Sequence, residues 1–437
     1  MTATPEAPTA YRASILHFLA DPGADDAAAS WQYFEDGLLV VEHGKVVSTG
    51  DAATLLPGLS LATRVIDHSG KLIVPGFVDT HIHYPQVDVI ASPGRQLLDW
   101  LEDYTFPAER RFDDPAYGRA VADFFLDELL RNGTTTALVF GTVHKQSVHA
   151  FFEAASAKNL RMIAGKVLMD RNCPEYLRDT PESGYADSAE LIAQWHGRDR
   201  LHYAITPRFA ITSSDRQLEL AGKLAAEHPT TRIHSHLAEN TAEVAWTREL
   251  FPACRSYLDV YDHFGLLREH SVFAHCIHLD ETDRRRMAAA GATAALCPTS
   301  NLFLGSGLFD IAAMDQAGMN FAIATDVGGG TSFSMLRTLS EAYKVAQLRG
   351  HFLSPLRAFY TATLGGARAL GLETNIGNFA PGKDADFVVL DLAATPLTAR
   401  RLQHARTLQE KLFALIMLGD DRAITQTCIL GRPVLPH

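Results

Sequence analysis

The stretch PGFVDTHIH, residues 75–83, marks a change in the pattern of the sequence. Before it, residues 11–74 carry short β-type runs, and Gly44 between two of them predicts a hairpin. After Pro75-Gly76, short apolar runs alternate with longer stretches of helical periodicity. The strands expected in this region are residues 77–80, 135–140, 162–169, 201–205, 231–236, 271–275, 292–296 and 320–324.

Eight strand candidates, most of them separated by helical patterns, predict an α/β protein with a (β/α)8 barrel of the TIM type. An open doubly wound sheet is the competing fold. β-type runs return after Pro381-Gly382, so we expect the two terminal segments to join in a small β-sandwich domain. The expected division is a disordered or arm-like N-terminus at 1–10, the small β domain at 11–74 and 378–437, and the catalytic barrel at 75–377.

Composition excludes several classes of protein. The chain has 437 residues, is 47% apolar and carries a net charge of −12 with histidine counted as neutral. The acidic balance argues against a nucleic-acid or membrane partner, and no apolar stretch approaches the roughly 18 residues of a transmembrane helix. No secretory signal is visible, and five cysteines without a CxxC pair argue against disulfides or a cysteine-based zinc site. We therefore expect a cytoplasmic enzyme.

The pair His81 and His83 ends the first expected strand of the barrel. Residues two apart in a strand point to the same side, so both imidazoles should project at the C-terminal mouth, where barrel active sites lie. Two imidazoles at this spacing can reach one metal ion. Taken alone, the pair could also be two unrelated histidines.

Three further strand ends carry polar residues of the same kind. His236 ends one strand and Glu239 opens the following turn, His275 ends the next strand, and Asp326 precedes Gly328-Gly329-Gly330 after the last. Taken singly, Glu239 also fits the start of a helix, and the other side chains also fit polar groups at the edge of the core.

Taken together, these strand ends predict one metal site. They supply three neutral nitrogens and one carboxylate to a divalent ion and leave a position for water. A metal ion would lower the pKa of that water toward about 7. Glu239 and Asp326 are then the natural proton carriers.

Several motifs resemble the amidohydrolase superfamily and, within it, the guanine deaminase family. The similarity runs from about residue 44 to about residue 390. The more specific motifs are HYPQ (83–86), LLDWLEDYTFPAE (97–109) and TDVGGGTSFSMLRT (325–338). The motifs shared more widely are PGFVDTHIH (75–83), HSHLAEN (234–240), FAHCIHL (273–279) and LCPTSNLFLGSGLF (296–309).

This resemblance implies one zinc ion per chain and a role for each matching residue. The implied zinc ligands are His81, His83, His236 and Asp326. The implied catalytic residues are Glu239, which moves protons to the purine ring, and Asp326 and His275, which lie near the reacting carbon. The implied substrate-binding residues are Gln86, Arg208, Phe209 and His236.

The implied activity is the hydrolytic deamination of guanine to xanthine and ammonia, in purine catabolism or salvage, by a homodimer. The residue types suit this substrate. Guanine is flat and polar along its edge, so Phe209 offers a face for stacking, Arg208 offers fixed donors to a carbonyl oxygen, and Gln86 offers both a donor and an acceptor.

Several alternatives stay open at this level. A sister enzyme could act on another aminopurine, a pterin or a triazine, and a non-catalytic barrel could serve as a scaffold. Lys166 is interpreted as a structural residue or charge partner, although binuclear relatives that hydrolyse cyclic amides bridge two metals through a carboxylated lysine. The sequence does not choose between zinc and iron, nor whether residues 95–111 form a lid or a dimer interface. The chain has no GxGxxG or Walker loop, so no nucleotide cofactor is expected.

Overall fold

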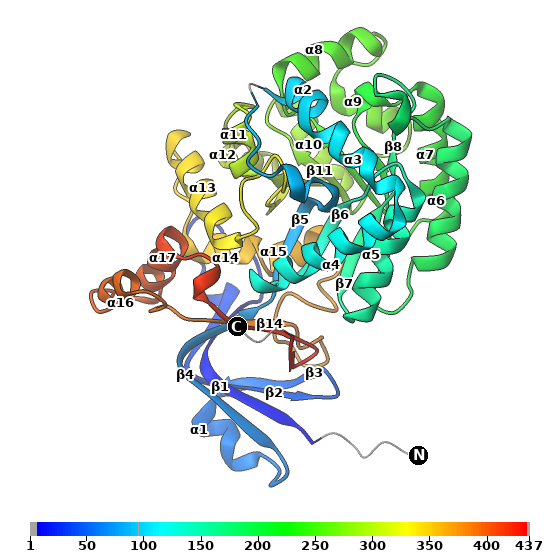
Figure 1. Ribbon diagram of the computed structural model, residues 1–437. Coiled ribbons are helices and arrows are strands. Elements are labelled where there is room, and N and C mark those ends of the chain that lie inside the picture. The colour runs from blue at the N-terminus through cyan, green and yellow to red at the C-terminus, as the bar shows by residue number, and fades with distance from the viewer. Residues whose placement is uncertain (1–6, 95, 435–437) are drawn as a thin grey trace, which may run out of the picture.

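Eight parallel strands form a nearly closed barrel in the computed structural model, which describes residues 7–94 and 96–434 (Figure 1). Each of them pairs with its neighbour in sequence order, and the short strand β8 adds to β9. The eight barrel strands are β5 (Phe77–His83), β6 (Thr134–Phe140), β7 (Arg161–Gly165), β9 (His202–Pro207), β10 (Arg232–Leu237), β11 (Ser271–His275), β12 (Thr293–Leu296) and β13 (Asn320–Ile323), and the added short strand is β8 (Val167–Leu168). The barrel prediction is confirmed.

The barrel closes between β5 and the segment that follows β13. The backbone N–H of His83 donates to the Val327 carbonyl oxygen at 2.7 Å, and that of Asp326 donates to the His81 carbonyl oxygen at 2.9 Å. Since the same two segments carry metal-ligand candidates, closing the barrel also brings those candidates together. An open doubly wound sheet would not place its first and last strands side by side.

The N-terminal end of the barrel is filled by apolar side chains. Leu370 and Ile376, which follow helix α15 (Leu364–Ala369), share a buried cluster with inward-facing barrel residues such as Val78 and Ala204. The interior is therefore a packed core rather than a pore, as is usual for this fold. This packing leaves the opposite mouth for chemistry.

Helices cover the outside of the barrel (Figure 1). Helix α4 begins at Pro115 because the side chain of Asp114 accepts a hydrogen bond from the backbone N–H of Ala116 in the first turn. The helices from β5 onward are α2 (Leu97–Trp100), α3 (Phe106–Arg110), α4 (Pro115–Arg131), α5 (Lys145–Ala157), α6 (Pro181–Trp195), α7 (Asp215–Glu227), α8 (Thr241–Leu250), α9 (Tyr257–His263), α10 (Glu281–Ala290), α11 (Pro298–Phe303), α12 (Ile311–Ala317), α13 (Met335–Leu348), α14 (Pro355–Thr361), α15, α16 (Pro396–Leu402) and α17 (Leu408–Leu418).

The terminal segments join in one mixed sheet of seven strands below the barrel in Figure 1. Its two arms approach each other, since the backbone N–H of Val46 donates to the Lys383 carbonyl oxygen at 2.9 Å. Residues from both arms, such as Leu39 and Phe387, share one buried core, so the two terminal segments join in one small β domain. The strands are β1 (Thr9–Phe18), β2 (Trp31–Glu42), β3 (Lys45–Asp51), β4 (Arg64–Pro75), β14 (Phe387–Leu390), β15 (Ile424–Ile429) and β16 (Arg432–Pro433), and the helix α1 (Ala52–Leu55) follows β3.

The predicted hairpin joins β2 to β3. His43 and Gly44 connect the two strands with φ angles of 50° and 74°. A two-residue connection with both φ angles positive is the turn that matches the twist of the flanking strands, and glycine adopts it without a steric cost. The hairpin in turn sets the register of the small sheet.

Two expectations about local structure need correction or comment. The strand expected over residues 162–169 is split at Lys166, whose backbone N–H donates to the Tyr203 hydroxyl instead of to a strand neighbour. The prediction for residues 1–10 falls mostly on residues 1–6, which lie outside the described residues, whereas Thr9 and Ala10 already belong to β1.

Two expectations about chemistry can also be compared with the structure. All five cysteines have free thiols. Within residues 7–94 and 96–434, every helix is too short or too polar to cross a lipid bilayer.

The first testable prediction concerns acid stability and His202, at the start of β9. Burial, helped by the positive charge of Arg232, lowers the pKa of His202 to about 3. An unfolded histidine has a pKa of about 6.5, so between these values only the unfolded chain binds the proton. The free energy of unfolding must therefore fall as pH falls through this window, by up to about 1.4 kcal/mol per pH unit for this group.

The substitution His202→Asn removes this contribution. We expect its melting temperature to drop less between pH 7 and pH 5 than that of the unsubstituted protein, by about 2 °C or more. Thermal unfolding followed by circular dichroism at both pH values measures the difference. Equal drops in the two proteins would contradict the prediction.

Candidate metal centre and active site

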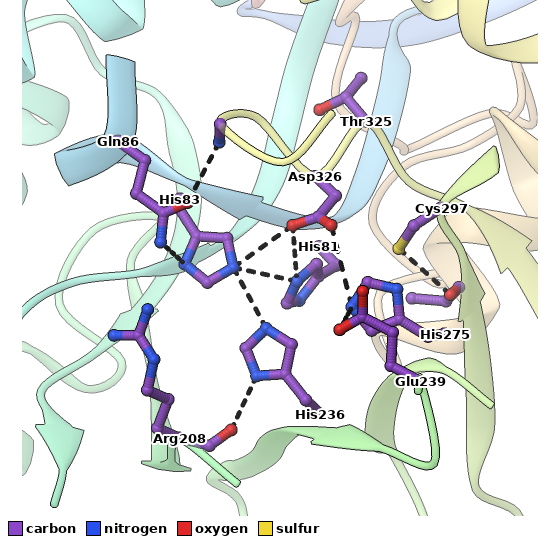
Figure 2. A network of polar contacts seen from close by, with 12 residues as sticks. His81, His83, Gln86, Arg208, His236, Glu239, His275, Cys297, Thr325 and Asp326 are labelled. Atoms are coloured by element: carbon purple, nitrogen blue, oxygen red, sulfur yellow. Dashed lines mark hydrogen bonds and ion pairs between the residues drawn. The ribbon is translucent and has the colours of Figure 1, made fainter. Parts of the chain in front are cut away.

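Four side chains from three strand ends converge at the C-terminal mouth of the barrel (Figure 2). The Nε2 atoms of His81 and His83 are 3.1 Å apart, and the Nε2 atoms of His83 and His236 are 3.3 Å apart. Asp326 Oδ1 lies 3.1 Å from His81 Nε2 and 3.3 Å from His83 Nε2. A tetrahedral zinc ion with bonds of about 2.1 Å holds its ligand atoms about 3.4 Å apart, so these spacings fit a metal ion at their centre.

The hydrogen bonds behind two of these imidazoles also suit metal binding. His236 Nδ1 lies 2.7 Å from the Arg208 carbonyl oxygen, which can only accept, so the proton is on Nδ1 and the lone pair is on Nε2. His81 Nδ1 lies 2.7 Å from Nε2 of His234, a buried residue behind the site. His234 thus holds the His81 ring in place from behind the site.

The protonation states are those a metal ion requires. Burial lowers the pKa of His83 to about 3 and that of His236 well below its ordinary value, so both rings are neutral. Burial alone would raise the pKa of Asp326, but His81 and His83 beside it hold this pKa well below the ordinary range. Three neutral nitrogens and one carboxylate are a ligand set that binds divalent ions without first losing protons.

The backbone around Asp326 is shaped for close approach. Asp326 itself has a φ angle of 52°, in the left-handed region. A Cβ atom on Gly330 would lie 1.8 Å from the Thr325 carbonyl oxygen, so only glycine fits there. Gly330 is therefore a packing requirement of the loop that presents the carboxylate.

Glu239 and His275 face each other beside the four clustered side chains. Glu239 Oε2 is 3.2 Å from His275 Nε2, and His275 Nδ1 is 2.9 Å from the side-chain oxygen of Asn301. Glu239 is 2% exposed, and burial raises its pKa to about 8, with the charge of Asp326 adding to the effect. A carboxyl group with this pKa both holds and releases a proton near neutral pH, as a general acid and base must.

The residues proposed to bind the purine lie in the wall of the same cavity as the metal-ligand candidates. This cavity is walled by Gln86, Arg208, Phe209 and Glu239. Every catalytic, ligand and substrate-binding candidate of the sequence except His81 therefore lines the cavity itself, and His81 touches two of its wall residues, His83 and Asp326.

Other residues of the site were not identified from the sequence. Ser306 donates a hydrogen bond to Glu239 Oε1 at 2.8 Å, and Ser300 and Leu304 line the cavity. All three lie in the motif at residues 296–309, which signalled family membership but gave no role to single residues. Trp100 and Leu101, from the motif at residues 97–109, also line the cavity.

Lys166 lies apart from this site. Its ammonium group is fully buried and forms an ion pair with Asp179. Lys166 is not among the described residues that line the cavity. This placement agrees with its interpretation as a charge partner.

Comparisons with known proteins agree with this geometry. The model of the amidohydrolase family matches residues 72–434. The chain is 54% identical to guanine deaminase of Escherichia coli (strain K12) over 410 residues, which cover 94% of this chain and 93% of that protein. A solved structure of E. coli guanine deaminase matches with a TM-score of 0.95 at 50% identity, covering 99% of this chain and 100% of that one.

A second solved structure is guanine deaminase from C. acetobutylicum with bound guanine in the active site. It matches with a TM-score of 0.88 at 28% identity, covering 98% of this chain and 100% of that one. Similarity over nearly the full length, in sequence and in fold, is far beyond what a shared barrel alone produces. The chain therefore belongs to the amidohydrolase family and, within it, to the guanine deaminases.

Proposed function

We infer that this protein catalyses the hydrolytic deamination of guanine to xanthine and ammonia. The observation that carries this conclusion is the single cavity that joins the histidine and aspartate cluster, the buried Glu239, and the Arg208-Phe209 pair. The cluster suits a hydrolytic metal ion, Glu239 suits proton transfer, and the pair suits a flat base with a carbonyl oxygen. The high identity to guanine deaminases supports the same substrate.

The cofactor in this proposal is one zinc ion per chain, held by His81, His83, His236 and Asp326. Imidazole and carboxylate ligands at tetrahedral spacing suit zinc, and Lys166 is held by Asp179 and is not free to bridge a second ion. When bound, such an ion polarises a water molecule and lowers its pKa toward neutrality.

Glu239 carries the protons in the proposed reaction. Its carboxylate accepts a proton from the attacking water, passes it to ring atom N3, and so draws electrons away from the attacked C2. His275 Nε2, 3.2 Å from Glu239 Oε2, and Asp326 Oδ2, 3.8 Å from the same nitrogen, hold the attacking oxygen. The second proton of the attacking oxygen passes to the amino group, the bond between C2 and the amino nitrogen breaks, and ammonia leaves, so that xanthine remains.

Arg208, Phe209 and Gln86 hold the base in this proposal. Arg208 and Phe209 are nearly fully buried in the cavity wall, with 2% and 4% of their surfaces exposed. His236, in contact distance of the Phe209 ring, borders the same space. The proposal further includes a homodimer, a role in purine catabolism or salvage, and a cytoplasmic location, with which five free thiols agree.

A panel of substrates tests this function. Purified protein loaded with zinc is given guanine, other aminopurines, a pterin with an amino group and a triazine with an amino group. Ammonia release is measured for each compound. We expect the highest kcat/KM on guanine, because its C6 oxygen can accept from Arg208. Faster turnover of another member would replace the substrate, and no turnover of any member in the zinc-loaded protein would favour a scaffold.

A further inference from the structure

Glu109 is a buried carboxylate just behind the wall of the cavity. It lies in helix α3 and has no exposed surface. Both of its oxygens accept from the same nitrogen, Nη1 of Arg208, at 2.9 Å each. Arg208 is 2% exposed, so this is an ion pair in the protein interior.

The rest of the Arg208 guanidinium is unused by the protein. Within residues 7–94 and 96–434, no hydrogen-bond partner lies within reach of its Nε and Nη2 atoms, although Arg208 lines the cavity. Figure 2 shows the guanidinium on the same side of the site as Gln86. A buried guanidinium with spare donors facing a cavity is suited to a ligand that carries an acceptor.

Glu109 also engages Gln86. The Gln86 amide nitrogen donates to Glu109 Oε1 at 3.2 Å and lies 3.1 Å from His83 Nδ1, while the amide oxygen accepts from the Gly328 N–H at 3.3 Å. The Gln86 amide is thus largely committed to the protein. Of these two side chains, Arg208 therefore has more free donors for the edge of the base.

We propose that Glu109 is a positioning residue for substrate recognition, which fixes the Arg208 guanidinium so that its free donors face the C6 oxygen of the purine. This inference rests on the proposed function, because it takes guanine as the substrate. A guanidinium is planar, so holding Nη1 from one side sets the direction of every other N–H. Phe106, in the same helix, has its ring centroid 5.4 Å from the Arg208 Cζ atom and limits the remaining motion.

The test uses two competitive inhibitors that lack the C2 amino group and cannot be deaminated. Hypoxanthine has the C6 oxygen, whereas purine lacks it and the proton on N1. A guanidinium has no acceptor, so Arg208 responds only to the oxygen. The ratio of the purine Ki to the hypoxanthine Ki, measured against guanine turnover in zinc-loaded enzyme, reports the contact.

We expect hypoxanthine to bind more tightly than purine to the unsubstituted enzyme and Glu109→Gln to reduce this preference by about 10-fold or more. Glutamine keeps the size of the side chain but loses the charge, and its amide N–H group would oppose the N–H groups of Arg208 or Gln86. KM for guanine should rise accordingly, with a smaller change in kcat. An unchanged ratio, or the lack of any preference in the unsubstituted enzyme, would overturn the proposal.

A matched control removes a buried ion pair elsewhere. Asp384 Oδ2 lies 2.6 Å from Arg161 Nη2, and both residues are buried away from the cavity. Asp384→Asn should lower the melting temperature without changing the inhibitor ratio. Equal changes of the ratio in both variants would mean that Glu109 is merely structural.

A second variant covers the case in which Glu109→Gln fails to fold. Glu109→Asp keeps the charge but shortens the side chain, so the same reduced ratio is expected and an unchanged ratio again refutes the positioning role. The two proposals fail separately: an unsubstituted enzyme that does not deaminate guanine refutes the function, whereas normal turnover with an unchanged ratio refutes only the role of Glu109.

Discussion

Replacing Glu239 by glutamine is expected to lower kcat by about 10²- to 10⁴-fold while the metal stays bound. Glutamine resembles the protonated carboxyl group and can still accept the hydrogen bond from Ser306, which reaches Oε1 at 2.8 Å. It cannot accept a proton from water or pass one to the ring, so the step that Glu239 carries is lost. Steady-state kinetics of ammonia release and metal analysis of the same preparation measure both parts of the prediction.

The matched control is Glu249→Gln, an exposed glutamate at the end of helix α8, which follows Glu239 in the chain. It removes the same charge at the protein surface and should leave kcat within about twofold, since surface substitutions away from the site have small effects. Turnover of Glu239→Gln near that of the control would refute the proton-carrier role. Loss of metal from Glu239→Gln would assign the residue to the ligand set instead.

Replacing His236 by alanine is expected to abolish metal binding and activity together. The substitution removes one of four ligand atoms that lie within 4.8 Å of one another, and it frees the Arg208 carbonyl oxygen to which Nδ1 is bonded. A bound metal ion contributes several kcal/mol to the transition state, so kcat should fall by about 10³-fold or more. Metal content by mass spectrometry and kcat on guanine are the two measurements.

The unsubstituted protein should hold about one zinc ion per chain, as in other mononuclear sites of this kind. Removing the ion with a chelator should abolish turnover, and adding zinc back should restore it in the unsubstituted protein but not in His236→Ala. Two ions per chain would contradict the mononuclear proposal and would make Lys166 a candidate for the residue that bridges them. Full activity in metal-free protein would contradict the metal-dependent mechanism as a whole.

The cavity gives a structural reason why the motif at residues 97–109 occurs in the same sequence as the metal-site motifs. Leu97, Trp100 and Leu101 line the cavity, and Glu109 at the end of the same segment is tied to Arg208. The N-terminal part of the segment therefore lines the cavity, and Glu109 at its C-terminal end is held by Arg208 behind the cavity wall. Its aromatic residues Trp100 and Phe106 belong to one buried cluster with Phe209.

The sequence by itself determined the barrel and the direction of the candidate ligands. Alternating apolar runs and helical patterns predicted all eight barrel strands, and the period of two placed His81 and His83 on one side of β5. Parallel strands in a barrel end at one mouth, so residues at four strand ends were expected to meet without any knowledge of distances.

Only the tertiary structure decided which side chains lie behind the site. The pairing of Glu109 with Arg208, 99 residues further along the chain, and that of Ser306 with Glu239 depend on how helix α3 and the loop before α12 pack on the barrel. The break at Lys166 likewise follows from the Tyr203 hydroxyl and Asp179, which come from other segments. Local patterns record which way a residue points along its own strand or helix, but contacts between distant segments exist only once the chain has packed, so no spacing within one motif encodes them.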